Sequence, residues 1–183
     1  MIVLPRLLDE LLGQVDGRRA AHLALDFARH ALEVQEAEIE PGVMAACQEC
    51  LAAAHEAIDL GEAGPRLLRA HERLYEAAER WEGNRNRLAL GAGLTVQAVR
   101  VGCQRMMEKA RERGMPSSLI TVRDVAHEIQ ADLGRGAASR FPDHGDDPRQ
   151  AGRLARWEEA RWQVRHVIAT EPAPGGSAPR PPS

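Results

Sequence analysis

Aspartate and histidine recur at helical spacing in two segments of this chain. Asp26 precedes His30 by four residues and Asp124 precedes His127 by three, so each pair lies on one face if its segment is helical. A carboxylate beside an imidazole exchanges protons readily, and the same groups bind metal ions inside helical bundles. Together with His71, these residues are candidates for a metal or acid–base site. Helical Asp–His pairs also form as surface hydrogen bonds, and we expect this structural role rather than a bound metal.

Cys47 and Cys50 form a Cys-x-x-Cys pair, a spacing found in redox sites and in halves of zinc sites. The redox form lies beside a strand, and no strand pattern precedes this pair. A zinc site needs two more ligands, for which His55 is the nearest candidate and Cys103 a distant one. Because Cys47 continues an apolar stripe, we expect the pair to pack in the core. Three cysteines are an odd number and indicate no disulfide framework, which favours a reducing cytoplasm.

The motifs of several common enzyme classes are missing from the sequence. There is no P-loop, no Gly-x-Gly-x-x-Gly after a strand and no Gly-x-Ser-x-Gly. There is also no Glu-x-x-His repeat of the di-iron type and no His-Glu-x-x-His. We therefore predict a protein without catalytic residues and without a cofactor.

Helices must position these side chains, because apolar residues recur every three or four positions along most of the chain. The fifth apolar stripe contains three glycines, so it predicts either one long helix or two. The last stripe consists of Leu154, Trp157, Val164 and Ile168. No alternating β-branched run predicts a strand. The stripes cover residues 4–15, 20–34, 44–58, 67–81, 88–110, 122–133 and 154–168.

Glycine, proline and capping residues mark the ends of these helices. We predict an all-α fold, an antiparallel bundle of six or seven helices over residues 1–169, because the connections are short. Residues 170–183 are rich in proline and glycine and predict a disordered tail. The boundary signals are Pro41-Gly42 ending the second helix, Gly61 ending the third, Gly64-Pro65 starting the fourth, a capping box at Thr121 to Asp124, and Asp147 before Pro148 at the last helix start.

The net charge of −3 is unevenly distributed, since residues 1–83 carry −8 and residues 84–183 carry +5. One explanation is attraction between two halves of a single bundle. The other is that a charged surface meets a partner of opposite charge, because complementary fields steer association. Under the second explanation, the acidic residues that we expect to contact the partner are Glu33, Glu36, Glu38 and Glu40.

Nucleic-acid binding is the alternative that the basic half suggests. Residues 94–100 and 118–126 have the pattern of short helix-turn-helix segments, and Arg100, Arg105 and Arg123 would contact phosphates. The negative net charge argues against this alternative. Membrane insertion is not expected, because no run approaches 18 uncharged apolar residues. The N-terminus has no basic segment followed by an apolar one, so we expect a cytoplasmic protein.

Several segments resemble the small alanine-rich helical proteins classed as immunity proteins of bacterial polymorphic toxin systems. Residues 24–32, Ala-Leu-Asp-Phe-Ala-Arg-His-Ala-Leu, are similar to the opening helix of that family. Residues 57–61 and 67–78 are similar to the end of its second helix and to its alanine-rich third helix, and residues 159–165 resemble its closing Trp-Gln helix. An Arg-Pro-Arg turn associated with the family is replaced by Glu-Pro-Gly at residues 40–42.

This resemblance implies a binding protein rather than a catalyst, a cytoplasmic antidote that occludes a cognate toxin. An acidic bundle surface would suit a basic toxin, because toxins that cleave nucleic acids must be basic to hold phosphates. We therefore expect a non-catalytic protein–protein interaction module. The DNA-binding regulator is the second hypothesis, and a helical-bundle metalloprotein is the third.

Overall fold

The structure is a computed structural model, and it describes residues 4–15, 17–61, 64–80, 121–137 and 147–171. These residues form α-helices and one 3-10 helix with no strand, which confirms the predicted all-α bundle. The predicted fifth helix at 88–110 lies outside the described residues, as do residues 172–183 of the predicted tail. The helices are α1 (Leu4–Leu12), α2 (Gly17–Val34), η1 (Glu36–Glu38), α3 (Pro41–Leu60), α4 (Pro65–Arg80), α7 (Val122–Arg135) and α8 (Pro148–Ala169).

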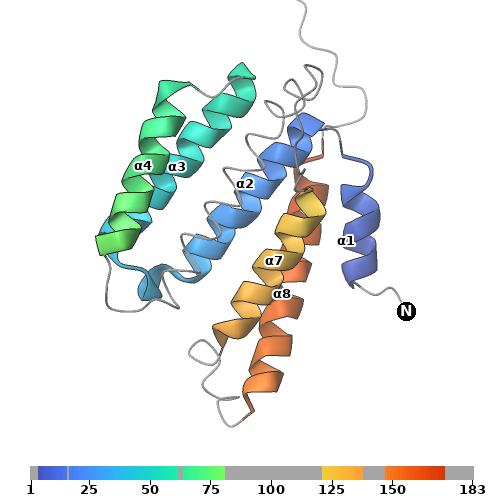
Figure 1. Cartoon of the computed structure of the whole chain (residues 1–183). Helices are drawn as coiled ribbons and strands as arrows, with labels where there is room; N and C mark the ends of the chain where they lie inside the picture. The colour runs from blue at the N-terminus through green and yellow to red at the C-terminus, as the bar shows by residue number, and fades with distance from the viewer. Residues whose placement is uncertain (1–3, 16, 62–63, 81–120, 138–146, 172–183) are drawn as a thin grey trace, which may run out of the picture.

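Helix α2 runs through the middle of the described bundle (Figure 1). On one side it packs against α3, which forms an antiparallel hairpin with α4. On the other side it packs against α7, which pairs in antiparallel fashion with α8, and α1 packs against α8. No helix of the described ranges is both long enough and apolar enough to cross a membrane.

Helix α2 buries a wider arc than its predicted stripe, because it has neighbours on two sides. Ala24, Phe27 and Ala28 of that stripe are fully buried, and Leu25 and Leu32 are buried beside them. At 100° per residue, these positions leave only a narrow polar stripe on the helix. Small alanines on the buried arc let the neighbouring helix axes approach closely.

The boundary between α2 and α3 differs from the sequence prediction. Helix α2 ends at Val34, and Pro41 does not end it but is the first residue of α3. Proline is well tolerated there because its missing N–H would have no helical partner. The Glu40 carboxylate caps α3 by accepting hydrogen bonds from the backbone N–H groups of Gly42 and Val43.

The other predicted boundaries are confirmed. Gly61 caps α3 with a φ of 74°, a left-handed conformation that glycine adopts without steric cost. Thr121 and Asp124 form a complete capping box at the start of α7. Asp147 caps α8 ahead of Pro148, accepting hydrogen bonds from two backbone N–H groups.

The predicted apolar stripe of α8 is partly wrong. Trp157 is 47% exposed and Ile168 is 54% exposed, whereas Val164 is buried. The buried face instead combines small residues with hydrogen-bonded polar ones, so hydropathy alone misplaces it. Its members are Ala151, Ala155, Glu159, Ala160, Gln163, Val164 and Val167.

The replacement of Gly152 by alanine should destabilise the protein. The added Cβ would lie 2.9 Å from the carbonyl oxygen of Gly134, where α8 meets α7. Alanine normally favours a helix interior by roughly 1 kcal/mol over glycine. Here we expect the free energy of unfolding to fall by about 1–3 kcal/mol, because backbone must move to relieve the contact. Urea denaturation measures this change.

The matched control is Gly64→Ala, because a Cβ at Gly64 meets nothing within 4 Å. This control should change stability by less than about 0.5 kcal/mol. A Gly152→Ala protein as stable as the wild type would contradict the close approach of α7 and α8.

Candidate functional site

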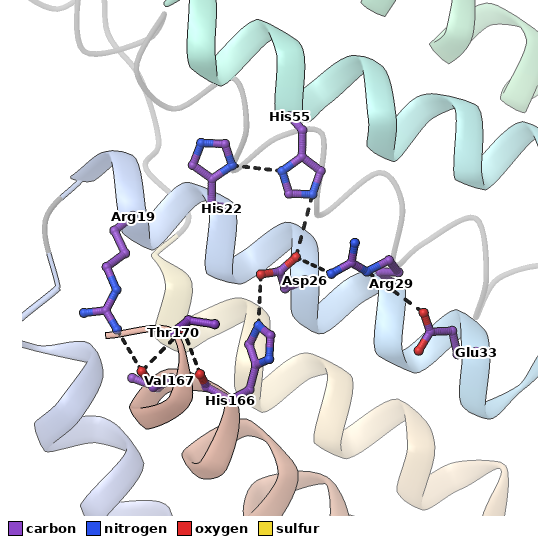
Figure 2. Close-up of polar contacts among 9 residues, drawn as sticks. All are labelled: Arg19, His22, Asp26, Arg29, Glu33, His55, His166, Val167 and Thr170. Carbon is purple, nitrogen blue, oxygen red and sulfur yellow. Dashed lines mark hydrogen bonds and ion pairs between the residues drawn. The ribbon is translucent and has the colours of Figure 1, made fainter. Parts of the chain in front are cut away.

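The polar stripe of α2 lies between α3 and α8 and brings histidines and carboxylates from three helices together (Figure 2). We call the following residues the histidine–carboxylate network: His22 and Asp26 of α2, His55 and Asp59 of α3, and His166 of α8. His22 and Asp26 lie on one face of α2, because residues four apart are about one helical turn apart.

The contacts on the α3 side form a chain through two imidazoles. His22 Nε2 lies 3.1 Å from Asp59 Oδ1, and His22 Nδ1 lies 2.8 Å from His55 Nδ1. His55 Nε2 lies 3.8 Å from Asp26 Oδ1, which is an ion-pair distance rather than a hydrogen bond. Arg18 Nη2 donates a hydrogen bond to Asp59 Oδ1 at 2.6 Å. The planes of the two imidazole rings are 16° apart, and their centroids are 5.1 Å apart.

Asp26 connects this chain to α8. Its Oδ2 lies 2.9 Å from His166 Nε2, and its Oδ1 accepts a hydrogen bond from Arg29 Nη2 at 2.7 Å. One carboxylate therefore contacts groups on α2, α3 and α8 (Figure 2). Charge-assisted hydrogen bonds of this kind are stronger than neutral ones.

Trp162 of α8 continues the contacts by stacking between two histidines. The ring centroids of Trp162 and His30 are 3.7 Å apart, with ring planes 3° apart. The ring centroids of Trp162 and His166 are 4.7 Å apart, with ring planes 9° apart. Phe27 meets Trp162 edge-on at 6.2 Å. Stacked and edge-on ring pairs add stability beyond the area that they bury.

A buried carboxylate lies behind the stacked rings. Glu159 is 2% exposed, and its Oε2 lies 3.0 Å from His30 Nδ1. Its Oε1 accepts a hydrogen bond from Gln163 Nε2 at 2.9 Å, and Gln163 Oε1 accepts one from Gln130 Nε2 at 2.8 Å. A buried charge is costly unless it is paired and hydrogen-bonded, and these partners meet that need.

Two groups of the network have shifted pKa values. Burial lowers the pKa of His55 below its ordinary value of 6.5, with His22 and Arg29 acting in the same direction and Asp26 and Asp59 opposing it. The hydrogen bond from Arg18 is the main reason that the pKa of Asp59 lies below its ordinary value of 3.8. The network thus holds proton donors and acceptors in mutual contact, and it favours a neutral His55.

The predicted metal or acid–base residues do not come together in one place. Asp26 joins the histidine–carboxylate network, whereas His30 contacts Glu159. Asp124 caps α7, and His127 Nε2 lies 3.2 Å from Asp9 Oδ1 of α1. The ring of His71, on α4, lies 5.4 Å from that of Tyr75. Within the part of the chain that the structure describes, no group of three His, Cys, Asp or Glu residues could hold a metal ion.

Cys47 and Cys50 lie apart from Arg123, the candidate nucleic-acid residue that the structure describes. Cys47 and Cys50 are fully buried on α3 among core residues. Arg123 Nη2 donates a hydrogen bond to the backbone carbonyl of Asp9 at 2.7 Å, which joins α7 to α1. Arg100 and Arg105 lie outside the described residues.

The four acidic candidates surround the α2–α3 connection. Glu33 is exposed, 4.0 Å from Arg29 Nε, and Glu36 and Glu38 are in η1. Glu40 is also exposed, but its carboxylate caps α3. The structure therefore separates one capping glutamate from three that belong to the turn and the end of α2.

Sequence reasoning missed His22, Asp59 and His166 of the histidine–carboxylate network and the separate buried Glu159, and it considered His55 only as a zinc ligand. The available signal was spacing by four, as in His22 to Asp26 and His55 to Asp59. Such repeats also occur on solvated helix faces, so they do not reveal that two polar stripes face each other.

Comparison with protein-family models, curated proteins and solved structures finds no match to this chain.

Removal of the His30 imidazole should destabilise the fold more than neutralising its buried partner does. In His30→Ala, the Glu159 carboxylate loses its neighbour and Trp162 loses a stacked ring. We expect the free energy of unfolding to fall by about 1–3 kcal/mol. Glu159→Gln keeps the shape and hydrogen-bonding capacity of the side chain and should cost less.

A double-mutant cycle with chemical denaturation isolates this contact. The double variant His30→Ala, Glu159→Gln should recover part of the stability lost in His30→Ala, because no buried charge remains unpaired. Strict additivity of the two single effects would show that the His30–Glu159 contact contributes nothing.

Acid should destabilise the protein as carboxylates titrate. The pKa values of Asp59 and Asp124 are lowered in the folded chain, by hydrogen bonds from Arg18 and Thr121 respectively. The unfolded chain therefore takes up these protons at higher pH. Their contribution to stability is fully present above about pH 4 and is lost as the pH falls through the folded values.

Stability measured from pH 6 to pH 2 tests this expectation. Asp59→Asn and Asp124→Asn should each be less stable at pH 6 and show a shallower loss in acid. Glu158→Gln, at an exposed position of α8, serves as the control. The assignment fails if Glu158→Gln flattens the acid profile as much as the two aspartate variants do.

Proposed function

We propose that this chain is a non-catalytic interaction module that binds a basic protein partner in the cytoplasm. The finer proposal is an immunity protein that neutralises a cognate toxin. The observation that supports binding of a basic partner is a group of acidic residues at the α2–α3 connection. We call Glu33, Glu36 and Glu38 the acidic turn. This acidic turn lies at one end of α2, where η1 connects it to α3 (Figure 1).

The acidic turn is favoured because two of its carboxylates, those of Glu33 and Glu36, are exposed. Glu33 has a 4.0 Å contact with Arg29 on its own helix, and such exposed pairs contribute little to stability. Glu36 is exposed in η1. Glu40, by contrast, caps α3 and is better assigned to folding than to partner binding.

The histidine–carboxylate network supports the same choice. Its polar groups bond to one another across α2, α3 and α8 and so hold helices in register. A partner of complementary charge would be steered toward the acidic turn, which raises the association rate more than the affinity. A toxin that cleaves nucleic acid fits this chemistry, because it must itself be basic to bind phosphates.

A double charge reversal tests this proposal. Glu36→Lys, Glu38→Lys should weaken capture of the partner at about 0.15 M salt and leave the helical circular dichroism unchanged. The control is Glu72→Lys, Glu158→Lys, which changes the net charge equally on exposed faces of α4 and α8. The measurement is affinity capture from the lysate of the organism that encodes the chain, with and without nuclease.

A partner that survives nuclease, is retained by the control and is lost by the acidic-turn variant would support the proposal. Equal capture by both variants would remove the acidic turn from the binding surface. Recovery of nucleic acid alone, abolished by nuclease, would replace the proposal with nucleic-acid binding.

A further inference from the structure

We propose that His22 and His55 form a proton-sharing pair that closes the open end of the α2–α3 hairpin, and that protonation of both rings in mild acid opens it. The pair lies at the end of α2 and α3 opposite the acidic turn, since α2 and α3 are antiparallel and are connected through η1. This inference stands on the geometry of the pair and is independent of the proposed partner.

The argument begins with a count of hydrogens. Three contacts run in series: Asp59 to His22 Nε2 at 3.1 Å, His22 Nδ1 to His55 Nδ1 at 2.8 Å, and His55 Nε2 to Asp26 at 3.8 Å. An ionised carboxylate only accepts hydrogen bonds, so His22 Nε2 must carry a hydrogen toward Asp59, whereas the 3.8 Å contact of His55 Nε2 requires none. The contact between the two Nδ1 atoms needs one hydrogen, because two would collide and none would leave lone pairs opposed.

Two hydrogens complete both hydrogen bonds, and two neutral rings carry them. A third hydrogen makes one ring an imidazolium and still leaves a single hydrogen between the two Nδ1 atoms. Two imidazolium rings have one hydrogen too many, because both Nδ1 atoms then carry one. In the singly charged pair, an imidazolium at His22 would donate to both Asp59 and His55, and His55 would accept through Nδ1. The lowered pKa of His55, caused mainly by burial, agrees with this arrangement.

The surrounding charges do not favour a second imidazolium. Arg18 and Arg29 of α2 contact Asp59 and Asp26 respectively, so each carboxylate already has a cationic neighbour. Asp26 is also bonded to His166 of α8, the group that faces the pair from that helix. A second proton would therefore place like charges together beside two carboxylates, Asp26 and Asp59, that already have cationic neighbours.

Protonation of both rings would change how α3 packs on α2, because the His22–His55 pair joins these two helices. Helix α3 packs against α4 and, through α2, against the remaining described helices. When both rings are protonated, two N–H groups oppose each other where the Nδ1 atoms are now 2.8 Å apart. Either a ring rotates or the helices separate, and in both cases the hydrogen bond between His22 of α2 and His55 of α3 is lost.

Nuclear magnetic resonance of the full chain tests the pair directly. Long-range proton–nitrogen spectra of uniformly labelled protein should show two separate protonation steps for His22 and His55 as the pH falls. Between the steps, His22 should carry hydrogens on both nitrogens and His55 on Nε2 alone. A single joint step, or a hydrogen on Nδ1 of His55 between the two steps, would overturn the proposal.

Hydrogen exchange tests the opening. Across the second step, amide exchange in α3, corrected for the intrinsic effect of pH, should rise about tenfold relative to α7 and α8, as expected for the loss of one hydrogen bond. His55→Gln retains an amide near His22 but cannot be charged, so it should abolish this increase. The control His127→Gln alters a histidine of α7 that contacts Asp9 and should leave the increase unchanged.

Two results would contradict the mechanism even if a variant folds poorly, because both can be obtained on the wild type. One is exchange in α3 that does not respond to the second protonation. The other is stoichiometric binding of added Zn²⁺ that eliminates both protonation steps, since a metal ion rather than a proton would then join the two nitrogens.

Discussion

The arrangement of α2, α3 and α8 depends on the contacts that the Asp26 carboxylate makes with all three helices. This carboxylate accepts a hydrogen bond from Arg29 on its own helix and lies against His166 of α8 and His55 of α3. Because these contacts are directional, they restrict how α3 and α8 slide or rotate against α2. Apolar packing on the opposite arc of α2 supplies the larger driving force, but it is non-directional.

The polar groups buried near this carboxylate lower the stability of the fold but favour a single register of α8. Glu159, Gln163 and Gln130 occupy buried positions that apolar side chains would fill with less desolvation cost. Their hydrogen bonds form in only one register of α8 against α2 and α7. In an alanine-rich interface, many helix registers have similar apolar contacts. The hydrogen bonds then distinguish the native register from the others.

The two ends of the α2–α3 hairpin have different chemistry. At the connected end, Glu40 has a structural role in capping α3, while Glu33 and Glu36 are exposed to solvent. At the open end, His22 and His55 hold the helices together through a contact whose hydrogen count changes with pH. The acidic residues at the connected end and the protonation of His22 and His55 at the open end thus concern the same two helices, α2 and α3.

Local chemistry allowed the sequence to determine the described helices and most of their ends. The capping box at Thr121, the cap at Asp147 and the left-handed Gly61 depend on neighbours a few residues away. The stripe of α8 and the network around Asp26 were decided only by tertiary structure, because His22, His55 and His166 are far apart in sequence. Spacing places a side chain on a face of its own helix, but packing alone determines which face it meets.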